Sequence, residues 1–305
     1  GVNWKTVNSY ARGGAAGRGV VAGGVNPSRT TSMDYITIST LGNTQNFGDL
    51  ITPSSVRGSF SSSTRGLWGG GLAPTATDEI DYVTIASAGN GIDFGNLSEA
   101  RLTYAGGLSS STRGIWASGA NPSKVTTMDY VEIATTGSAL DFGDTEALSN
   151  VQATASPTRG YICGGNSGSG AVRTIRQVTI ASKGDSVDVA ELSATSNSST
   201  MASNSVRTVL FAGQSPVKDL TSMETFNLVT AGNAVVFGDL SSIRMLSASV
   251  ASSTRGVNIS GRTDPSTNVN NMEYVTFSSL GDAVDFGDIS EGRHKFQGCS
   301  DSHGG

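Results

Sequence analysis

Arginine and aspartate recur in this sequence at intervals that could build an anion site or a metal site. Six arginines, each the first residue of an Arg-Gly motif or its variant, are separated by 47, 48, 46, 48 and 48 residues: Arg18, Arg65, Arg113, Arg159, Arg207 and Arg255. Guanidinium groups bind carboxylates and phosphates, so six of them on one face of a ring would attract an anion. Later in the repeat stand Asp49, Asp144, Asp239 and Asp288. A calcium ion needs six to eight oxygen ligands, which one aspartate per repeat does not supply.

The Asp-Phe-Gly triplet occurs three times at the repeat spacing, at residues 93–95, 141–143 and 285–287. In a kinase, the aspartate of such a triplet holds magnesium, but a kinase also needs a Gly-rich loop, a paired lysine and an HRD loop. None of these is present in the sequence. We therefore interpret the triplet as a structural turn, in which the phenylalanine packs between repeats and the glycine and the next aspartate shape the chain. The five phenylalanines at this position are Phe47, Phe94, Phe142, Phe237 and Phe286.

For the six arginines, too, we favour a structural role over a binding role. An arginine at a fixed position of a repeat is expected to lie in a hydrogen-bond network that joins neighbouring repeats. Its partner would be a carboxylate, with the four aspartates named above as candidates, or backbone carbonyl groups of the next repeat. An anion-binding role for the six remains the less favoured alternative.

Four short segments in each repeat have the pattern of β-strands. A weak segment precedes each arginine, an apolar run follows it (RGVVAGG, RGLWGGG), and then come alternating segments (MDYITIST, IDYVTIAS) and the segments QNFGDL and IDFGNL. Alternation at period two indicates half-buried strands, and the joints are rich in Gly, Asn, Asp and Ser. Four strands in 46–48 residues, repeated six times, predict an all-β six-bladed β-propeller with four antiparallel strands per blade. We expect one propeller domain over residues 1–305.

The repeat resembles that of kelch-like propellers, because a glycine doublet ends the second strand (Gly23-Gly24, Gly69-Gly70 and Gly164-Gly165). The spaced Tyr and Trp that follow the doublet in kelch repeats are missing here. The unit STRG…GG…DYVTI…DFGDL is more similar to repeats of bacteriophage structural proteins, notably tail-fibre-like proteins of marine phages and cyanophages. This resemblance covers nearly the whole chain and implies a component of a virion.

The weak first segment occurs seven times, which is once more than six blades need. The terminal copies are Ser9–Ala15 and Arg293–Cys299. We expect one of them to complete the last blade and so to close the ring. The other would add to the edge of a neighbouring subunit by β-augmentation, or connect to a longer chain.

Few residues remain that could perform catalysis. The only histidines are His294 and His303, and no nucleophile signature accompanies them, so neither a hydrolytic triad nor a copper site can be built. Cys163 and Cys299 lie about three repeats apart and are expected to be free thiols. We predict that the protein is not an enzyme and has no cofactor, metal site or catalytic residue.

The aromatic residues divide into a predicted core set and a predicted contact set. Trp68 and Trp116 share one repeat position, for which we favour core packing over a carbohydrate platform. Trp4, in the N-terminal arm, could anchor a contact with another subunit, and Tyr10 and Phe296 in the terminal strands are further candidates for that interface. Repeat four is the most divergent, with Val189-Ala190 in place of Phe-Gly, which we ascribe to drift and less to a special contact.

Composition narrows the class of partner. The net charge is −5, charged residues make up 15%, and no Lys/Arg run or long apolar stretch occurs, so we expect neither nucleic-acid binding nor membrane insertion. A polar but charge-poor surface indicates a virion or extracellular location. The favoured function is a phage tail, fibre or capsid-surface propeller that contacts other copies or virion proteins and binds a host surface. The alternatives are a self-assembling extracellular filament linked by strand donation, and a lectin-like propeller that binds cell-surface glycans through its variable loops at residues 26–31, 72–78, 121–126 and 262–270.

Overall fold

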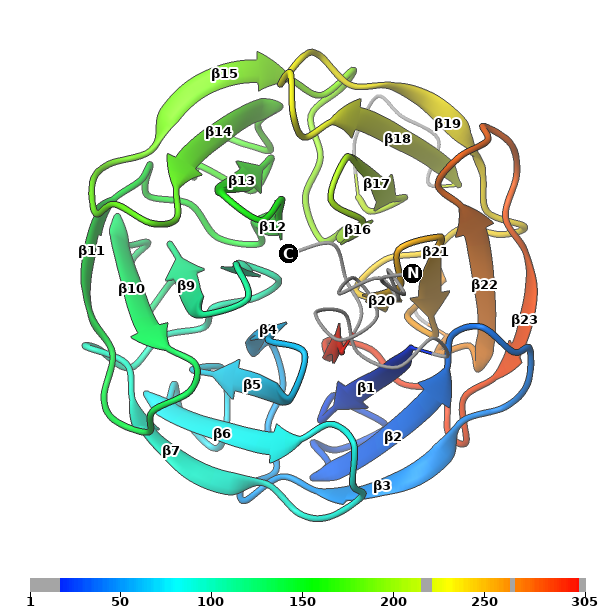
Figure 1. Cartoon of the computed structure of the whole chain (residues 1–305), viewed down its shortest axis with the longest axis horizontal. Coiled ribbons are helices and arrows are strands. Elements are labelled where there is room, and N and C mark those ends of the chain that lie inside the picture. Colours follow the sequence, from blue (N-terminus) through cyan, green and yellow to red (C-terminus); the bar gives the residue numbers. More distant parts are fainter. Residues whose placement is uncertain (1–16, 215–220, 264–266, 302–305) are drawn as a thin grey trace, which may run out of the picture.

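The chain folds into a closed ring of six four-stranded antiparallel sheets, as the computed structural model shows (Figure 1). The structure describes residues 17–214, 221–263 and 267–301. The predicted all-β six-bladed propeller is therefore confirmed. No helix of the described residues is long and apolar enough to cross a membrane.

Each blade runs outward from the central axis through an inner, a second, a third and an outer strand. Blade I holds β24 (Gln297–Ser300), β1 (Arg18–Ala22), β2 (Ser32–Thr37) and β3 (Gln45–Asp49); blade II holds β4 (Gly58–Ser61), β5 (Arg65–Gly69), β6 (Glu79–Thr84) and β7 (Ile92–Asn96); blade III holds β8 (Gly107–Ser109), β9 (Arg113–Ala117), β10 (Thr127–Glu132) and β11 (Leu140–Asp144). Blade IV holds β12 (Gln152–Ala155), β13 (Arg159–Cys163), β14 (Thr174–Thr179) and β15 (Val187–Glu191); blade V holds β16 (Thr200–Ser203), β17 (Arg207–Phe211), β18 (Ser222–Asn227) and β19 (Val235–Asp239); blade VI holds β20 (Ala248–Ala251), β21 (Arg255–Ile259), β22 (Asn271–Thr276) and β23 (Val284–Asp288).

The ring closes in blade I, where the C-terminal strand β24 becomes the inner strand. It pairs antiparallel with β1, so that Val20 lies opposite Cys299. All six blades thus have four strands within the described residues. The predicted N-terminal segment Ser9–Ala15 lies outside those residues.

The core is divided among the six seams between blades. Each hydrophobic cluster joins side chains of two neighbouring blades, and the seam between blades II and III, for example, holds Phe94 and Trp116. The second strand is buried at every position after its arginine because both of its faces are covered, whereas the third strand mixes buried with partly exposed positions. A blade alone could not bury these faces, so the ring is the unit of folding.

The Phe-Gly-Asp motif lies in the outer strand, which confirms the strand predicted for QNFGDL and IDFGNL and shows that the reading of the triplet as a turn is wrong. The register between the third and outer strands shifts by a β-bulge in every blade, and a bulge puts one extra residue in one strand. Gly48 has φ +151°, and a Cβ atom there would lie 2.3 Å from the carbonyl oxygen of Gly89 in the next blade. The glycine is needed because the neighbouring blade's turn docks directly on this strand.

The two faces of the ring differ. In an antiparallel blade, the connections from the second to the third strand and the crossovers to the next blade emerge at the same end. We call this end the loop face. The opposite end, the turn face, carries the remaining two turns of each blade.

Candidate functional site

The six repeat arginines connect each blade to the next on the turn face. Arg18 donates from one terminal nitrogen to the carbonyl oxygens of Ile85 and Ala86 at 3.1 and 2.8 Å, and Arg65 makes the same pair of bonds to Ile133 and Ala134. The equivalent bonds of the other arginines run from Arg113 to Ile180 and Ala181, from Arg159 to Val229, from Arg207 to Phe277 and from Arg255 to Ile38 and Ser39. In four blades the guanidinium also lies over a tyrosine ring of the third strand, 4.5–4.8 Å from its centroid.

Backbone carbonyls, and not the four aspartates, are thus the partners of these arginines. Three of the four aspartate carboxylates instead accept a hydrogen bond from a threonine of their own blade: Asp49 from Thr31 at 2.7 Å, Asp144 from Thr126 at 2.8 Å and Asp239 from Thr221 at 3.2 Å. The expectation of an arginine–aspartate network is wrong. Each arginine begins the second strand at the turn face, whereas the aspartates end the outer strand at the loop face, so the two side chains lie at opposite ends of the blade. The carbonyl alternative is correct, and it engages one terminal nitrogen of each of the six arginines.

The aromatic side chains that recur in the repeat are packed inside the seams between blades. Phe47, Phe94, Phe142, Phe237 and Phe286 are each at most 3% exposed. Trp68 and Trp116 are completely buried, and each indole donates to a backbone carbonyl of the preceding blade. The core reading of the tryptophans is therefore correct, and they offer no platform to a sugar.

The proposed aromatic contact set is not supported where it can be tested. Phe296 is 1% exposed and packs in the seam between blades VI and I, so it cannot anchor a partner as expected. Its position just before β24 places it inside the blade that closes the ring. Trp4 and Tyr10 lie outside the described residues.

A second set of arginines, which the sequence pattern did not reveal, is buried within the blades. Arg101 and Asp129 are both fully buried and form an ion pair of 2.7 Å, and Arg101 donates further to the Ser118 carbonyl. Comparable pairs are Arg57–Asp81, Arg244–Glu273 and Arg293–Asp34. In blade IV the polarity is reversed, since Arg176 takes the carboxylate position and pairs with Glu146 and Asp188.

These pairs also hold the crossovers between blades. The Asp129 carboxylate accepts the backbone N–H of Ser98, which follows the outer strand of the preceding blade. Arg57, Arg101 and Arg244 stand 8 to 12 residues before the next Arg-Gly motif or its variant, and because these distances differ, the arginines do not recur at a fixed interval in the sequence. The role of the pairs Arg57–Asp81, Arg101–Asp129, Arg244–Glu273 and Arg293–Asp34 is structural because both charges of each are removed from solvent.

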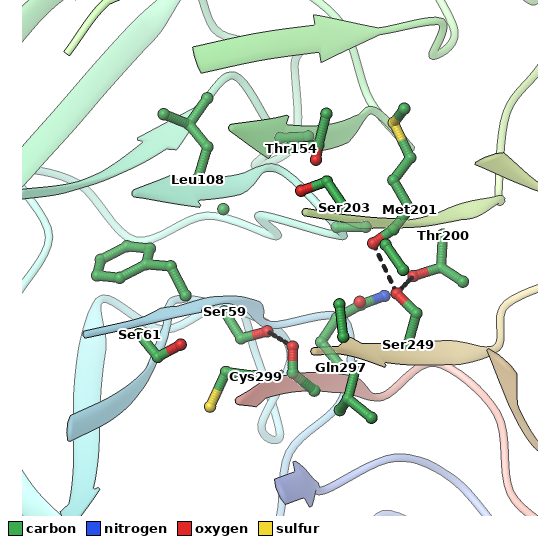
Figure 2. A pocket seen from close by; sticks show the side chains of 18 of the residues that line it. Ser59, Ser61, Leu108, Thr154, Thr200, Met201, Ser203, Ser249, Gln297 and Cys299 are labelled. Carbon is green, nitrogen blue, oxygen red and sulfur yellow. Dashed lines mark hydrogen bonds between the residues drawn. The ribbon is translucent and has the colours of Figure 1, made fainter. Parts of the chain in front are cut away.

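The axial channel is narrow and lined with small residues of the inner strands (Figure 2). Its cavity volume is about 90 Å³, whereas pockets for drug-sized ligands usually have about 300–1,000 Å³. Serine hydroxyls in the channel donate to the carbonyl of the equivalent residue in the preceding blade: Ser61 to Ser300, Ser109 to Ser61, Ser203 to Ala155 and Ser300 to Ala251. The channel therefore serves to join the inner strands, and it has room for a few water molecules.

The mouth of the channel on the loop face is surrounded by six non-glycine residues in the left-handed conformation, one per blade. Their φ angles lie between 53° and 60°: Val56, Tyr104, Asn150, Ser198, Leu246 and Lys295. Such strain often marks a functional site, but here it has a structural use. The N–H of Val56 donates to the Lys295 carbonyl, and that of Tyr104 to the Val56 carbonyl, at 2.8 and 2.9 Å. The strain turns backbone groups toward the neighbouring blade and closes the ring near its axis.

Among the described residues, the thiol and imidazole groups that could take part in catalysis or metal binding are buried or lie outside any cluster of such groups. Burial raises the pKa of the Cys163 and Cys299 thiols, both of which are free and buried. Burial, followed by the charges of Arg262 and Lys295, lowers the pKa of His294 to about 4. Among residues 17–214, 221–263 and 267–301 there is no cluster of three His, Cys, Asp or Glu side chains that could hold a metal ion.

A groove of about 640 Å³ lies on the loop face between blades VI and I. Its lining includes Asn26 and Pro27 from one variable loop and Thr267 and Asn268 from the other, with His294 between them. His294 Nδ1 lies 2.8 Å from the Asn268 side-chain oxygen. This groove brings together two of the loops in which the repeats differ most, and it is the best candidate for a binding site.

Comparison with known proteins adds no relative to this description. No protein-family model matches the chain, and no curated protein matches it. The propeller fold is therefore established by the structure alone, and the likeness of the repeat to kelch-like and phage repeats stays a prediction.

Proposed function

We propose that the protein is a non-enzymatic structural and binding component of a virion, such as a phage tail, fibre or capsid-surface propeller. The observation that carries this proposal is the use to which the repeated polar side chains are put. Arginines of the Arg-Gly motif, buried ion pairs and channel serines all hold blades together. Because these contacts join neighbouring blades at the turn face, in the interior and along the axis, the ring is a rigid support for the variable loops of the loop face.

The polar, charge-poor composition supports a virion or extracellular location. Only 15% of the residues are charged, and the sequence is rich in Ser, Thr, Asn and Gly, a composition typical of extracellular and virion β-proteins. The repeat similarity to phage structural proteins supports the same assignment. Other copies of this chain or other virion proteins would be its assembly partners.

The filament alternative requires a free strand edge, and the outer strands offer little of one. In blade I, the carbonyls of Phe47 and Asp49 accept hydrogen bonds from Gly89 and Gly91 in the next blade's turn, both at 2.7 Å. The Asp49 N–H is bonded to the Asn90 side chain. Because the next blade covers this edge, β-augmentation there would first have to displace the turn.

Electron microscopy of the native material, with gold-labelled antibody against this chain, tests the proposal. Label on phage particles at a tail, fibre or capsid surface is the expected result. Labelled filaments without phage heads would refute the virion assignment and favour the filament. Deletion of residues 1–16 gives a second test: loss of the filaments on deletion would show that the N-terminal segment links subunits.

A further inference from the structure

Three cations that form no ion pair with a described residue lie on the loop face at the seam between blades VI and I. Arg29 lies in the variable loop of blade I, Arg262 in that of blade VI, and Lys295 at the channel mouth. Among the described residues none of the three forms an ion pair. In a chain of net charge −5, such a concentration of unpaired positive charge needs an explanation.

Backbone pairing brings these residues together. Val25 forms a bridge with Arg29 on one side and with His294 on the other, while Arg262 bridges to Met245. The Lys295 N–H donates to the carbonyl of Leu246, the residue after Met245, at 2.8 Å. The three cations thus come from segments that lie side by side.

The charges act on one another. Burial lowers the pKa of Lys295, and the charges of Arg262 and Arg29 lower it further. Like charges are held close together in proteins only when the fold or a ligand compensates them. Among the described residues no carboxylate forms an ion pair with any of the three cations, and Glu291, on the same face, accepts a hydrogen bond from Asn26 instead.

Arg29 also has a buried donor with no acceptor. Its Nε is shielded from solvent and makes no hydrogen bond. The other buried charged side chains that have an unbonded atom are Asp34, Asp81, Asp129, Arg176, Arg244 and Arg293, and each of these belongs to an ion pair. Arg29 alone does not, and a desolvated guanidinium nitrogen without an acceptor is costly.

We propose that Arg29, Arg262 and Lys295 form a binding site for the carboxylate or sulfate groups of an acidic glycan. The groove beside them supports a sugar ligand, because the side chains of Asn26, Asn270 and Ser290 line it. The Asn26 amide and the Ser290 hydroxyl already donate to Glu291 and Asp34, so these two side chains would serve as acceptors for sugar hydroxyls. The arginine guanidinium binds the oxygen atoms of such anionic groups through two parallel N–H···O hydrogen bonds. This site deepens the binding part of the proposed function and rests on it.

The test measures binding of the full chain to oligosaccharides by calorimetry at low and high salt. A sulfated heparin-type oligosaccharide and an oligogalacturonate are compared with a neutral dextran oligosaccharide of equal length. Salt-sensitive binding of at least one acidic oligosaccharide, and none of dextran, is expected. Equal binding of dextran, or no binding of either acidic oligosaccharide, would overturn the proposal.

Variants locate the site. The double variant Arg29→Gln/Arg262→Gln should weaken binding about tenfold or more, with an unchanged melting temperature. Lys124→Gln is the matched control, because Lys124 bridges to Ala120 in the loop of blade III just as Arg29 bridges to Val25. Equal losses in the control and the double variant would refute the location.

A titration with inorganic sulfate gives an independent measurement. An anion at this site opposes the repulsion from Arg262 and Lys295, so the NMR-measured pKa of His294 should rise from about 4. A rise without binding of either acidic oligosaccharide would keep the anion site and refute the glycan. These outcomes do not depend on whether electron microscopy finds the protein on virions, so the two proposals can fail separately.

Discussion

Replacement of Gly114 by alanine should destabilise the ring more than the same change at the equivalent glycine of blade VI. A Cβ atom on Gly114 would lie 1.8 Å from Cε2 of Phe60 in the neighbouring blade, well inside van der Waals contact. The ring of Phe60 cannot withdraw, because it packs against the buried Trp116 with centroids 4.3 Å apart. Overpacking of a rigid core typically costs about 1–3 kcal/mol, and we expect about 3 kcal/mol here.

Blade VI provides the control. At Gly256 the added Cβ would meet the Ala202 Cβ at 3.0 Å, so a shift of a few tenths of an ångström suffices. Neither glycine has a positive φ, so both variants gain the same small benefit from a less flexible unfolded chain, about 0.4–1 kcal/mol. Gly256→Ala should therefore change the free energy of unfolding by less than about 1 kcal/mol.

Urea unfolding at constant m-value measures both effects. The variant Phe60→Ala recreates in blade II the alanine that faces Gly256 in blade VI. Gly114→Ala should cost little when it is added to Phe60→Ala, although Phe60→Ala alone costs about 3–5 kcal/mol. Equal destabilisation by Gly114→Ala and Gly256→Ala, or additive effects of Gly114→Ala and Phe60→Ala, would refute this account of the Arg-Gly glycine.

Three further outcomes follow from buried groups. Asp129→Asn leaves a fully buried arginine without its counter-charge and should cost about 3–5 kcal/mol in chemical denaturation. Glu132→Gln removes a partly exposed pair and should cost at most about 1 kcal/mol. Similar losses of stability in the two variants would contradict the burial argument. Because burial raises the pKa of the thiols of Cys163 and Cys299, a thiol reagent at pH 8 should label neither in the native protein and both after unfolding, so rapid native labelling would be the contrary result. The pKa of His294 is about 4 in the folded protein and 6.5 when unperturbed. The unfolded state therefore binds more protons between these two values, and stability falls as the pH drops from 6.5 to 4. His294→Gln should flatten that part of a profile of melting temperature against pH, and an unchanged profile would show that the histidine is not the cause.

The candidate site was only partly predictable from the sequence. Variation among repeats pointed to the loops that contain Asn26 and Asn268, and both line the groove. The sequence did not indicate that Arg29 would lie near Arg262 and Lys295, because Arg29 is separated from the other two by most of the chain and approaches them only where the ends of the ring join. Nor did it predict the partners of the repeat arginines, since the choice between carboxylates and carbonyls depends on distances between blades.

By itself the sequence determined the number and type of the repeating units. Arg-Gly motifs at 46–48-residue intervals and period-two alternation are local properties of the chain, and they predict four strands per blade without knowledge of their packing. The tertiary structure decided that β24 closes blade I, that Phe-Gly-Asp forms a bulged outer strand, and that Phe296 is buried. These features depend on contacts between residues far apart in the chain, such as Gly19 with Ser300, because closing the ring sets which surfaces lose contact with water.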